Sequence, residues 1–466
     1  MESGQSLATQ IDELFHPSSI AVVGVPRGMK TGKLFLMALL DQGFSGPVYP
    51  IHPEAKEIEG LKAYPHVSEI PGPVDLAIVL VPHHNTLSVI KECAAKGVKG
   101  AVLFAAGYRE TGTGEGKALE EELVRVARSS GMRLIGPNCM GLYSPKAGLS
   151  NFPELSREPG PVGIISQSGS LTNILCRMAP RKGIRFSKVV SLGNECDLTS
   201  ADFLTYLGKD TETGVIGIYL EGVKNGPLFL ESLRTASMEK PVILWKSGLT
   251  PEGGAAAASH TGALSGSREI WESVARQGGA VTVVGLEAWV DILMGFSLLP
   301  SCLGDRLAII SGPGGLAVSA AEACGNAGLR LARPSPETMS ALAEFIPKTG
   351  TSVCNPVDVG LTAFMEMDLY MRSTRILLED SGVDGLVVVG IGMTPEANHK
   401  FAESMIKAQK EYQKPLIMVN IPGFDPGIAE GFCRAGIPSF DSVERAIETY
   451  ARVRNYRLWR GKRRGF

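Results

Sequence analysis

A pattern of strand, glycine-bearing turn and helix occurs twice in this chain and constrains its fold more than any other feature. The segment "GPVGIISQSGSLTNILCRMA" (160–179) runs from a short apolar stretch through a Gly and Ser turn into a helix-like stretch. The segment "DRLAIISGPGGLAVSAAEAC" (305–324) repeats this order, with Ile-Ile-Ser before the turn in both. Later apolar runs correspond in the same way, at 214–222 and 241–248 after the first segment and at 385–392 and 415–423 after the second. Since alternating strands and helices fold into parallel α/β layers, the sequence predicts a weak internal duplication of two flavodoxin-like units.

The part of the chain before the duplication alternates in the same way. Four apolar runs have the character of strands: "SIAVVGV" (19–25), "VDLAIVLVP" (74–82), "GAVLFAAG" (100–107) and "MRLIGPN" (132–138). Helix-like patterns, such as 84–96 and 116–130, lie between them. Near-continuous apolar runs are typical of strands that are buried on both faces of a parallel sheet. We therefore expect a doubly wound, Rossmann-like domain before the two flavodoxin-like units.

The predicted fold class is thus α/β, with three doubly wound domains. A chain of 466 residues suits this number, because a single hydrophobic core stops growing beyond about 250–300 residues. Pro, Gly and Ser cluster without periodicity at 144–161 and 298–305, which marks boundaries. The predicted domains are a Rossmann-like domain at 8–148, a flavodoxin-like domain at 158–298 and a second flavodoxin-like domain at 303–466.

The charge balance gives no electrostatic reason to bind nucleic acid or a membrane. The 46 Lys and Arg residues and 48 Asp and Glu residues leave a formal net charge of −2. No apolar run approaches the roughly 20 residues that span a bilayer, and the N-terminus "MESGQSLATQIDELF" lacks the apolar stretch of a signal peptide. The eight cysteines are scattered without a CxxC pair, which favours reduced thiols in a cytoplasmic protein and no metal site.

The turn after the first predicted strand, "VVGVPRGMKTGK" (22–33), is a candidate phosphate site. Its glycines, beginning with Gly24, allow the backbone to approach a phosphate at a helix start. Arg27 and Lys33 add positive charge that suits a phosphate-rich ligand. The turn lacks the GxGxxG spacing, and the second strand ends without a clear acidic residue for a ribose, so NAD is disfavoured. An ordinary βα turn with surface cations is the alternative.

Two later turns of the first domain are expected at the carboxyl edge of its sheet. They are "VPHHN" (81–85), which contains Pro82, and "AAG" (105–107), which contains Ala106 and Gly107. Ligands of open α/β sheets bind at this edge. Both turns are therefore candidates for the binding crevice.

The segment "SQSGSLTNIL" (166–175) places Ser168, Gly169 and Ser170 at the start of a predicted helix. The free amides and the dipole at a helix start attract an anion without a cationic side chain. An ordinary N-cap by Ser168 or Ser170 is the alternative, and the two roles can coexist.

Two further residues are candidates for catalysis. "IYLEGVKNG" (218–226) places Glu221 at the solvent-facing end of an apolar strand, where the alternative is a solvated turn residue. "AAAASHTGAL" (255–264) surrounds His260 with small residues, which predicts a loop with room for bulky reactants and freedom to move. A carboxylate near an imidazole orients the ring and raises its basicity, which suits a nucleophilic histidine. A structural histidine is the alternative.

Taken together, these segments resemble the α subunit of the NDP-forming acyl-CoA synthetases, in the branch of the ADP-forming acetyl-CoA synthetases, which are relatives of succinyl-CoA synthetase. The resemblance covers nearly the whole chain. The motifs that carry it are the first βα turn (24–33), "IGPNCMGLY" (135–143), "GIISQSGSLT" (163–172), "SLGNECDL" (191–198), "YLEGVKNG" (219–226), "SHTGALSGS" (259–267) and "NPVDVG" (355–360). It implies a ligase that interconverts acyl-CoA, ADP and phosphate with a carboxylic acid, CoA and ATP, through an acyl phosphate and a phosphohistidine.

The resemblance also implies roles for individual residues. His260 matches the histidine that is phosphorylated, and Glu221 matches the glutamate that holds its imidazole. Ser168, Gly169 and Ser170 match the helix start that receives the phosphate of the phosphohistidine. The residues matched to CoA binding are Gly24, Arg27, Lys33, Pro82, Ala106, Gly107 and Asn138. The loop "VPRGMKTGK" departs from the usual opening of the family at this position.

The resemblance further implies a partner, because none of the three predicted domains corresponds to an ATP-grasp domain. We expect a separately encoded ATP-grasp β subunit that binds ATP or ADP with Mg²⁺, in a heterotetramer. The last sixteen residues (451–466) contain seven basic residues and no acidic one, which predicts either a solvated tail or a contact with an acidic partner face. Two other functions stay open: a CoA-binding regulatory protein without catalysis, and a Rossmann-type oxidoreductase.

Overall fold

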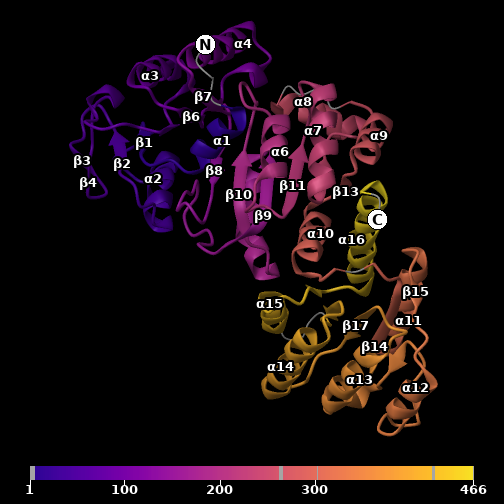
Figure 1. Ribbon diagram of the computed structural model, residues 1–466. Coiled ribbons are helices and arrows are strands. Elements are labelled where there is room, and N and C mark those ends of the chain that lie inside the picture. The colour runs from indigo at the N-terminus through magenta and orange to yellow at the C-terminus, as the bar shows by residue number, and fades with distance from the viewer. Residues whose placement is uncertain (1–5, 262–265, 302, 422–425, 465–466) are drawn as a thin grey trace. The chain divides into compact units, whose positions relative to one another are not determined.

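The computed structural model describes residues 6–261, 266–301, 303–421 and 426–464, without the side chains of 258–261 and 426. The chain forms two compact units, Met1–Arg177 with Arg185–Gly285, and Met178–Ile184 with Leu286–Phe466 (Figure 1). The first unit contains two large sheets and a small hairpin, and the second unit contains a third large sheet. The predicted α/β class, built on doubly wound sheets, is confirmed.

The first sheet is fully parallel, and its strands lie in the order β2-β1-β5-β6-β7. The chain first winds to one side of β1 and then to the other, which is the flavodoxin-type variant of a doubly wound sheet. This reversal places a crevice at the carboxyl ends of β1 and β5. The strands are β1 (Ile20–Val23), β2 (Val48–Ile51), β5 (Leu76–Val79), β6 (Gly100–Leu103) and β7 (Arg133–Ile135), and the hairpin after β2 consists of β3 (Glu57–Ile58) and β4 (Leu61–Lys62).

Helices cover both faces of this sheet, which explains its near-continuous apolar strands. Ile20 and Val22 belong to one core cluster, and Ala21 and Val23 belong to another on the opposite face. Successive side chains of a strand point to opposite faces, so a strand covered on both sides must be apolar throughout. The helices are α1 (Leu7–Phe15) and α2 (Thr31–Gln42) on the first face and α3 (His83–Lys96) and α4 (Gly114–Ser129) on the second, with short turns η1 (Val67–Glu69) and η2 (Arg109–Thr111).

The second sheet lies in the same unit and has the order β13-β12-β11-β9-β10-β8. Only β8 is antiparallel to its neighbour among the described strands of this sheet. The strands are β8 (Gly141–Tyr143), β9 (Pro159–Ser166), β10 (Phe186–Ser191), β11 (Val215–Leu220), β12 (Val242–Lys246) and β13 (Val281–Val283). The helices are α5 (Gly169–Met178), α6 (Ser200–Lys209), α7 (Gly226–Glu239), α8 (Pro251–Thr261) and α9 (Arg268–Gly278).

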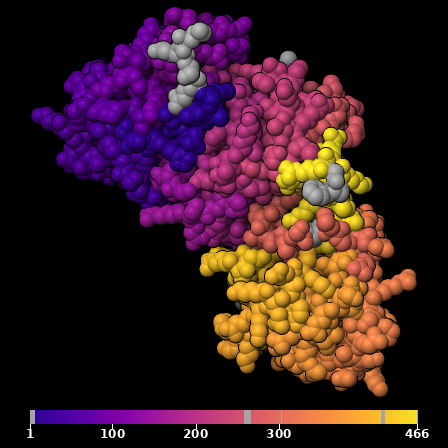
Figure 2. Space-filling model, in the orientation of Figure 1, coloured from indigo at the N-terminus to yellow at the C-terminus, as the bar shows by residue number. Residues whose placement is uncertain are grey.

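The two sheets of the first unit share one hydrophobic core. Helix α1 packs against α6, where the ring of Phe15 stacks on Tyr206 with centroids 6.0 Å apart. The Tyr206 hydroxyl donates a hydrogen bond to Asp12 Oδ1 at 2.6 Å. In the space-filling view, the dark blue atoms of the N-terminal segment lie directly against magenta atoms of the second sheet's segment (Figure 2). This shared core holds the carboxyl edges of both sheets in a fixed arrangement.

The second unit is built on a third parallel sheet, in the order β15-β14-β17-β18-β19, with β16 also paired to β14. Its strands are β14 (Arg306–Ser311), β15 (Arg330–Leu331), β16 (Val357–Asp358), β17 (Gly385–Val389), β18 (Leu416–Val419) and β19 (Ser439–Phe440). Its helices and turns are η3 (Ala179–Lys182), α10 (Leu286–Leu298), α11 (Gly314–Asn326), α12 (Pro336–Ala343), η4 (Leu361–Phe364), α13 (Asp368–Glu379), α14 (Pro395–Tyr412), α15 (Pro426–Arg434) and α16 (Val443–Arg464).

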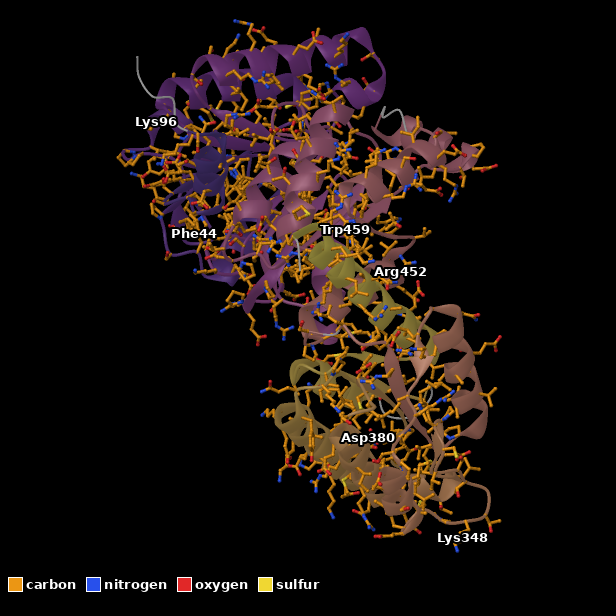
Figure 3. All side chains as sticks on the ribbon, turned by 45° about the vertical axis from the view of Figure 1, so that its right-hand side comes forward. Phe44, Lys96, Lys348, Asp380, Arg452 and Trp459 are labelled. Atoms are coloured by element: carbon orange, nitrogen blue, oxygen red, sulfur yellow. The ribbon has the colours of Figure 1, made fainter. Side chains whose placement is uncertain are left out.

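Residues 451–464 of the basic segment form the end of α16, along which Arg452 and Trp459 lie (Figure 3). Arg454 Nε donates to the carbonyl of Leu303 at 3.0 Å, and Arg457 donates to the carbonyls of Leu299 and Pro300. Part of this basic segment therefore binds carbonyls that follow α10 in its own unit, so it is not a simple solvated tail.

The proposed domain boundaries stay a prediction, and two elements cross them. β8 lies inside the range 8–148 but pairs with β10 of the second sheet. α10 lies inside the range 158–298 but belongs to the compact unit of the third sheet. Among the described residues, no helix combines the length and the apolar composition needed to cross a membrane.

Candidate active site

A cavity of about 340 Å³ lies in the first unit, where β6 and β9 end at their carboxyl termini. Its walls come from both sheets of the unit. They are formed by Phe104, Ala105 and Ala106, by Asn138, Cys139 and Met140, and by Gln167, Ser168, Gly169 and Ser170. The structure thus brings together five residues that the sequence singled out separately: Ala106, Asn138, Ser168, Gly169 and Ser170.

The start of α5 forms one wall of the cavity. Ser168 Oγ accepts a hydrogen bond from the amide of Leu171 at 3.3 Å and so caps the helix. Ser168 is itself held by Ser166 Oγ, which accepts from its amide at 3.1 Å. The cap uses the amide of Leu171, so it does not exclude the predicted anion site at the start of α5, which stays a prediction. A Cβ on Gly169 would lie 2.6 Å from Met140 Cγ, so only glycine allows the two walls to approach this closely.

The opposite wall is the turn that contains Asn138. Asn138 has a left-handed backbone conformation, with φ of 58°, and its amide donates to the carbonyl of Ala105 at 3.0 Å. This bond fixes the turn after β7 to the turn after β6. The alanine turn and the asparagine turn therefore form one continuous surface of the cavity.

The segment 193–197 fastens the second sheet to this wall. The amide of Asn194 donates to the carbonyl of Pro137 at 3.0 Å, and the Asn194 side chain donates to Glu110 Oε2 at 2.5 Å. Asp197 is fully buried and accepts hydrogen bonds from Arg133 Nε at 2.8 Å. Burial raises the pKa of Asp197, but the bonds from Arg133 and from a backbone amide outweigh it and hold the pKa below its usual value. The carboxylate is therefore ionised and locks the two sheets together.

Gly193 is the position where this contact is tightest. Its φ is +53°, and a Cβ there would lie 2.1 Å from the carbonyl oxygen of Pro137 and 2.3 Å from that of Asn138. Because these are backbone atoms, we expect Gly193→Ala to lower the free energy of unfolding by at least about 2 kcal/mol. Gly226→Ala is the matched control, since a Cβ at Gly226 meets no atom within 4 Å. Urea titration of both variants checks this, and equal stability of the two would contradict it.

Glu221 was expected at a solvent-facing strand end, and this expectation is wrong. Its side chain is buried, with 6% of the residue exposed, and its backbone is bound by the side chains of Gln167 and Lys246. Its Oε1 accepts a hydrogen bond from the hydroxyl of Tyr219 at 3.3 Å. The ammonium group of Lys246, at the end of β12, donates to the Glu221 carbonyl at 2.8 Å.

Lys246 is a functional candidate that the sequence reasoning missed. Burial lowers the pKa of Lys246 to about 8, and the nearby Glu221 carboxylate opposes this shift. A charged residue at the end of the apolar strand "PVILWK" is the same signal that pointed to Glu221. Gln167 and Glu195 were also missed as individual residues, although both stand inside quoted motifs.

His260 lies in α8, while its side chain is outside the described part of the structure. The sequence predicted a loop here, and this is wrong because the alanines before His260 strongly favour helix. Helix α8 contacts η2, the turn that follows the alanine turn of the first sheet. The backbone at His260 is thus carried on an element that reaches the first sheet, and the separation of His260 from Glu221 is outside the described residues.

The other candidate residues of the first domain do not line the cavity, although they lie at the carboxyl edge of the same sheet. Gly24 has φ of +87°, and a Cβ there would lie 2.8 Å from Val81 Cγ1, so the turn packs tightly at the crevice beside Pro82. Lys33 Nζ binds Glu59 at 2.6 Å, and its side chain is only 13% exposed. Arg27 is 59% exposed and lies 3.4 Å from Glu54. Arg27 is therefore the more accessible cation.

Gly107, next to the cavity wall, is held by Glu110. Its φ is +118°, and its amide donates to Glu110 Oε1 at 2.6 Å. Burial raises the pKa of Glu110, but the bonds from Gly107, Asn194 and Tyr108 outweigh it, so the pKa lies below its usual value. The ionised carboxylate fixes the shape of the alanine turn.

Three family models match successive parts of the chain. A model described as a CoA binding domain matches residues 18–145, a succinyl-CoA ligase like flavodoxin domain matches 159–296, and a ligase-CoA domain matches 307–418. The cavity therefore lies where the CoA-binding domain meets the flavodoxin-like domain. This combination defines the class of CoA ligases related to succinyl-CoA ligase.

Relatives specify the family within this class. The α subunit of acetate–CoA ligase [ADP-forming] II from Pyrococcus furiosus is 37% identical over 452 residues, which cover 95% of this chain and 97% of that relative. Acetyl-coenzyme A synthetase 1 from Ca. Korarchaeum cryptofilum, solved with phosphate and ADP, has a TM-score of 0.86 and 36% identity, and the match covers 97% of both chains. The chain belongs to the family of ADP-forming acetate–CoA ligases and corresponds to their α subunit. The predicted family, ligase class and CoA-binding domain are confirmed.

Some members of the family are longer single chains. Acetate–CoA ligase [ADP-forming] I from Archaeoglobus fulgidus is 37% identical over 449 residues, which cover 96% of this chain but 64% of that relative. The present chain thus spans slightly less than two thirds of such a relative.

Proposed function

We propose that this chain is the part of an ADP-forming acid–CoA ligase that binds the acyl-CoA and carries the phosphoryl group on His260. The observation that carries the proposal is the single cavity formed by the turns of the CoA-binding domain and the start of α5. A thioester that follows the carboxyl edge of the first sheet and a phosphate at the start of α5 would meet in this cavity.

The reaction would proceed in three transfers. An oxygen of phosphate attacks the thioester carbonyl, the C–S bond breaks, and CoA leaves as the thiol after taking a proton. A ring nitrogen of His260 then attacks the phosphorus of the acyl phosphate, and the carboxylic acid leaves as its carboxylate. An oxygen of ADP finally attacks the phosphorus of the phosphohistidine, which restores the imidazole and gives ATP.

The residues of this chain would act by positioning and charge stabilisation, which provide most of the catalysis in phosphoryl transfer. The amides of Gly169 and Ser170, at the start of α5, would hold the phosphate. Glu221 would accept a hydrogen bond from one ring nitrogen of His260 and leave the other free for phosphorus. Lys246, already directed at the Glu221 carbonyl, would balance the buried carboxylate.

The proposal includes a partner. Relatives are named as α subunits, and about a third of the longer relative from Archaeoglobus fulgidus lies outside its match to this chain, which supports a separate β subunit with an ATP-grasp domain. That subunit would supply the site for ADP and Mg²⁺, in a heterotetramer. The cytoplasmic location stays a prediction from the sequence.

The test is co-expression of the chain with a candidate β subunit and incubation of the complex with acetyl-CoA, ADP, phosphate and Mg²⁺. We expect free thiol and ATP to appear in equal amounts, and a panel of acyl-CoA thioesters to identify the preferred acid. CoA binding without ATP formation from any thioester in the panel would instead indicate a regulatory CoA-binding protein.

Removal of one exposed cation tests whether CoA binds along the crevice of the first sheet. We expect Arg27→Ala to weaken CoA binding to the isolated chain about two- to fivefold at low salt, because Arg27 is exposed beside the crevice and rim ion pairs contribute this much. The effect should shrink at 1 M salt, where charges are screened within about 3 Å. Calorimetry at both salt concentrations measures this, with Lys91→Ala on α3 as the control. Lys33 is a less suitable target for this test than Arg27, since Glu59 already binds its ammonium group.

If Arg27→Ala and wild type bind CoA with the same affinity at low salt, Arg27 does not contact CoA.

A further inference from the structure

The side chain of Gln167 connects three loops at the carboxyl edge of the second sheet. Its Nε2 donates to Glu195 Oε1 and to the carbonyl of Gly222, both at 2.8 Å. Its Oε1 accepts from the amide of Glu221 at 2.5 Å and from that of Gly222 at 3.1 Å. Only one orientation of the amide satisfies all four neighbours, because two of them are acceptors and two are donors. Gln167 therefore fixes the turn that carries Glu221.

Glu195 fixes Gln167 in turn. It is buried, with 2% of the residue exposed, and both carboxylate oxygens are used. Oε1 accepts from Gln167, and Oε2 accepts from the amide of Ser200 at 3.1 Å and from its hydroxyl at 3.3 Å. A carboxylate is an acceptor only, whereas an acid or an amide also carries a donor. A neutral group at this position would therefore set a donor against Ser200 or against Gln167.

If Gln167 turned over to relieve such a conflict, its Nε2 would face the amides of Glu221 and Gly222, which are donors themselves. A neutral group at 195 thus disturbs the Glu221 turn, unless its donor faces Ser200 and Gln167 keeps its orientation. The same Gln167 side chain lines the cavity.

We propose that Glu195 is a positioning residue for phosphoryl transfer, which through Gln167 sets the turn of Glu221 and so the carboxylate that orients His260. Glu195 does not line the cavity, and it acts only through Gln167. The inference rests on the proposed function of Glu221 and His260, while the chain of hydrogen bonds stands on its own.

The burial and charge environment of Glu195 make its hydrogen bond to Gln167 dependent on pH. Burial raises the pKa of Glu195 from 4.5 to about 7, against the bonds from Ser200 and Gln167 and the charge of Lys224. The groups that face it are Lys224, whose Nζ donates to the Glu195 carbonyl at 2.8 Å, and the thiol of Cys196, whose pKa is raised by burial. Beyond these lie Glu221, on the other side of Gln167, and Glu120 of α4, 3.8 Å from Lys224.

As pH rises through about 7, we expect the rate of phosphoryl transfer to increase and the contribution of Glu195 to stability to decrease. The ionised form of Glu195 holds the turn, so phosphoryl transfer should rise as pH rises through about 7. The folded chain binds this proton more tightly than the unfolded chain, so the stabilising contribution of Glu195 is fully present below about pH 4.5 and is lost as pH rises through about 7. Glu195→Gln should therefore slow the reaction at pH 8 without lowering the melting temperature.

The experiment measures the turn directly, by hydrogen exchange of the amides of Glu221 and Gly222 in the full chain. At pH 8 we expect Glu195→Gln to reduce their protection about tenfold or more. Wild type should lose protection between pH 8 and pH 6, and Glu195→Gln should show no such change. Glu212→Gln is the matched control, because Glu212 binds Lys188 at the opposite edge of the same sheet. Unchanged protection in Glu195→Gln would overturn the inference, whatever the activity.

A second measurement follows phosphorylation of His260 in the complex with the β subunit. We expect Glu195→Gln to lower the phosphorylation rate about tenfold at pH 8 and to remove the rise in rate near pH 7, while the affinity of the chain for CoA, measured separately, stays unchanged. The positioning role would be overturned if Glu195→Gln lost protection but kept the wild-type phosphorylation rate. It would also be overturned if the rate in Glu195→Gln still rose with pH near 7. Failure of the wild-type complex to phosphorylate His260 would refute the proposed function instead, and the exchange measurement would still decide whether Glu195 sets the turn.

Discussion

Replacing His260 by Asn is expected to abolish the phosphoenzyme. In the complex with the β subunit and labelled ATP, wild type should acquire an acid-labile phosphoryl group, and His260→Asn should reduce the labelling rate at least about 10³-fold, a loss typical of essential groups in phosphoryl transfer. The fold should survive, because Asn and His have similar helix propensities and α8 is not a core strand. Label incorporation followed by mass spectrometry measures the result.

His399→Asn is the control for this experiment. His399 lies on α14 of the second unit, where it is exposed and 3.3 Å from Glu403. The His399→Asn variant should be labelled at the same rate as wild type. Stoichiometric labelling of His260→Asn at another residue would contradict the assignment of His260.

Replacing Glu221 by Gln should slow phosphorylation of His260 about 10²-fold, within the range typical of a lost acid–base or orienting carboxylate. The substitution keeps the shape of the side chain and removes its charge. The bond from the Glu221 amide to Gln167 involves the backbone, so the turn should stay in place. Rapid-quench measurement of the phosphoenzyme gives the rate, and CoA affinity should be unchanged.

The burial of Glu221 adds a second readout to this prediction. The Glu221 carboxylate raises the pKa of Lys246 against the effect of burial, so in Glu221→Gln that pKa should fall below its value of about 8. Reactivity of Lys246 toward an amine reagent as a function of pH detects the change. Glu231→Gln, on the exposed surface of α7, is the control. A wild-type rate of phosphorylation in Glu221→Gln would mean that the carboxylate has only a structural role.

The sequence singled out five of the ten residues that line the cavity, because the features that mark them are local. The apolar strand before Ser168 and the small residues after it indicate a helix start, and that start is present at Gly169. Ala106 and Asn138 were each placed at the end of a strand, and parallel strands bring their carboxyl ends to one edge. Two expectations were wrong for different reasons: Glu221 is buried by the packing of the unit, and His260 lies on a helix that the alanines before it favour.

The sequence by itself determined the α/β class, the three successive α/β segments and the family, since apolar periodicity, glycine turns and motifs are properties of short stretches of chain. Only the tertiary structure decided which polar groups meet. Gln167 binds Glu195, 28 positions away, and the amide of Glu221, 54 positions away, and no local pattern links these residues. The physical reason is that hydrogen bonds between loops depend on strand order and on burial, both of which are set when the whole unit folds around a shared core.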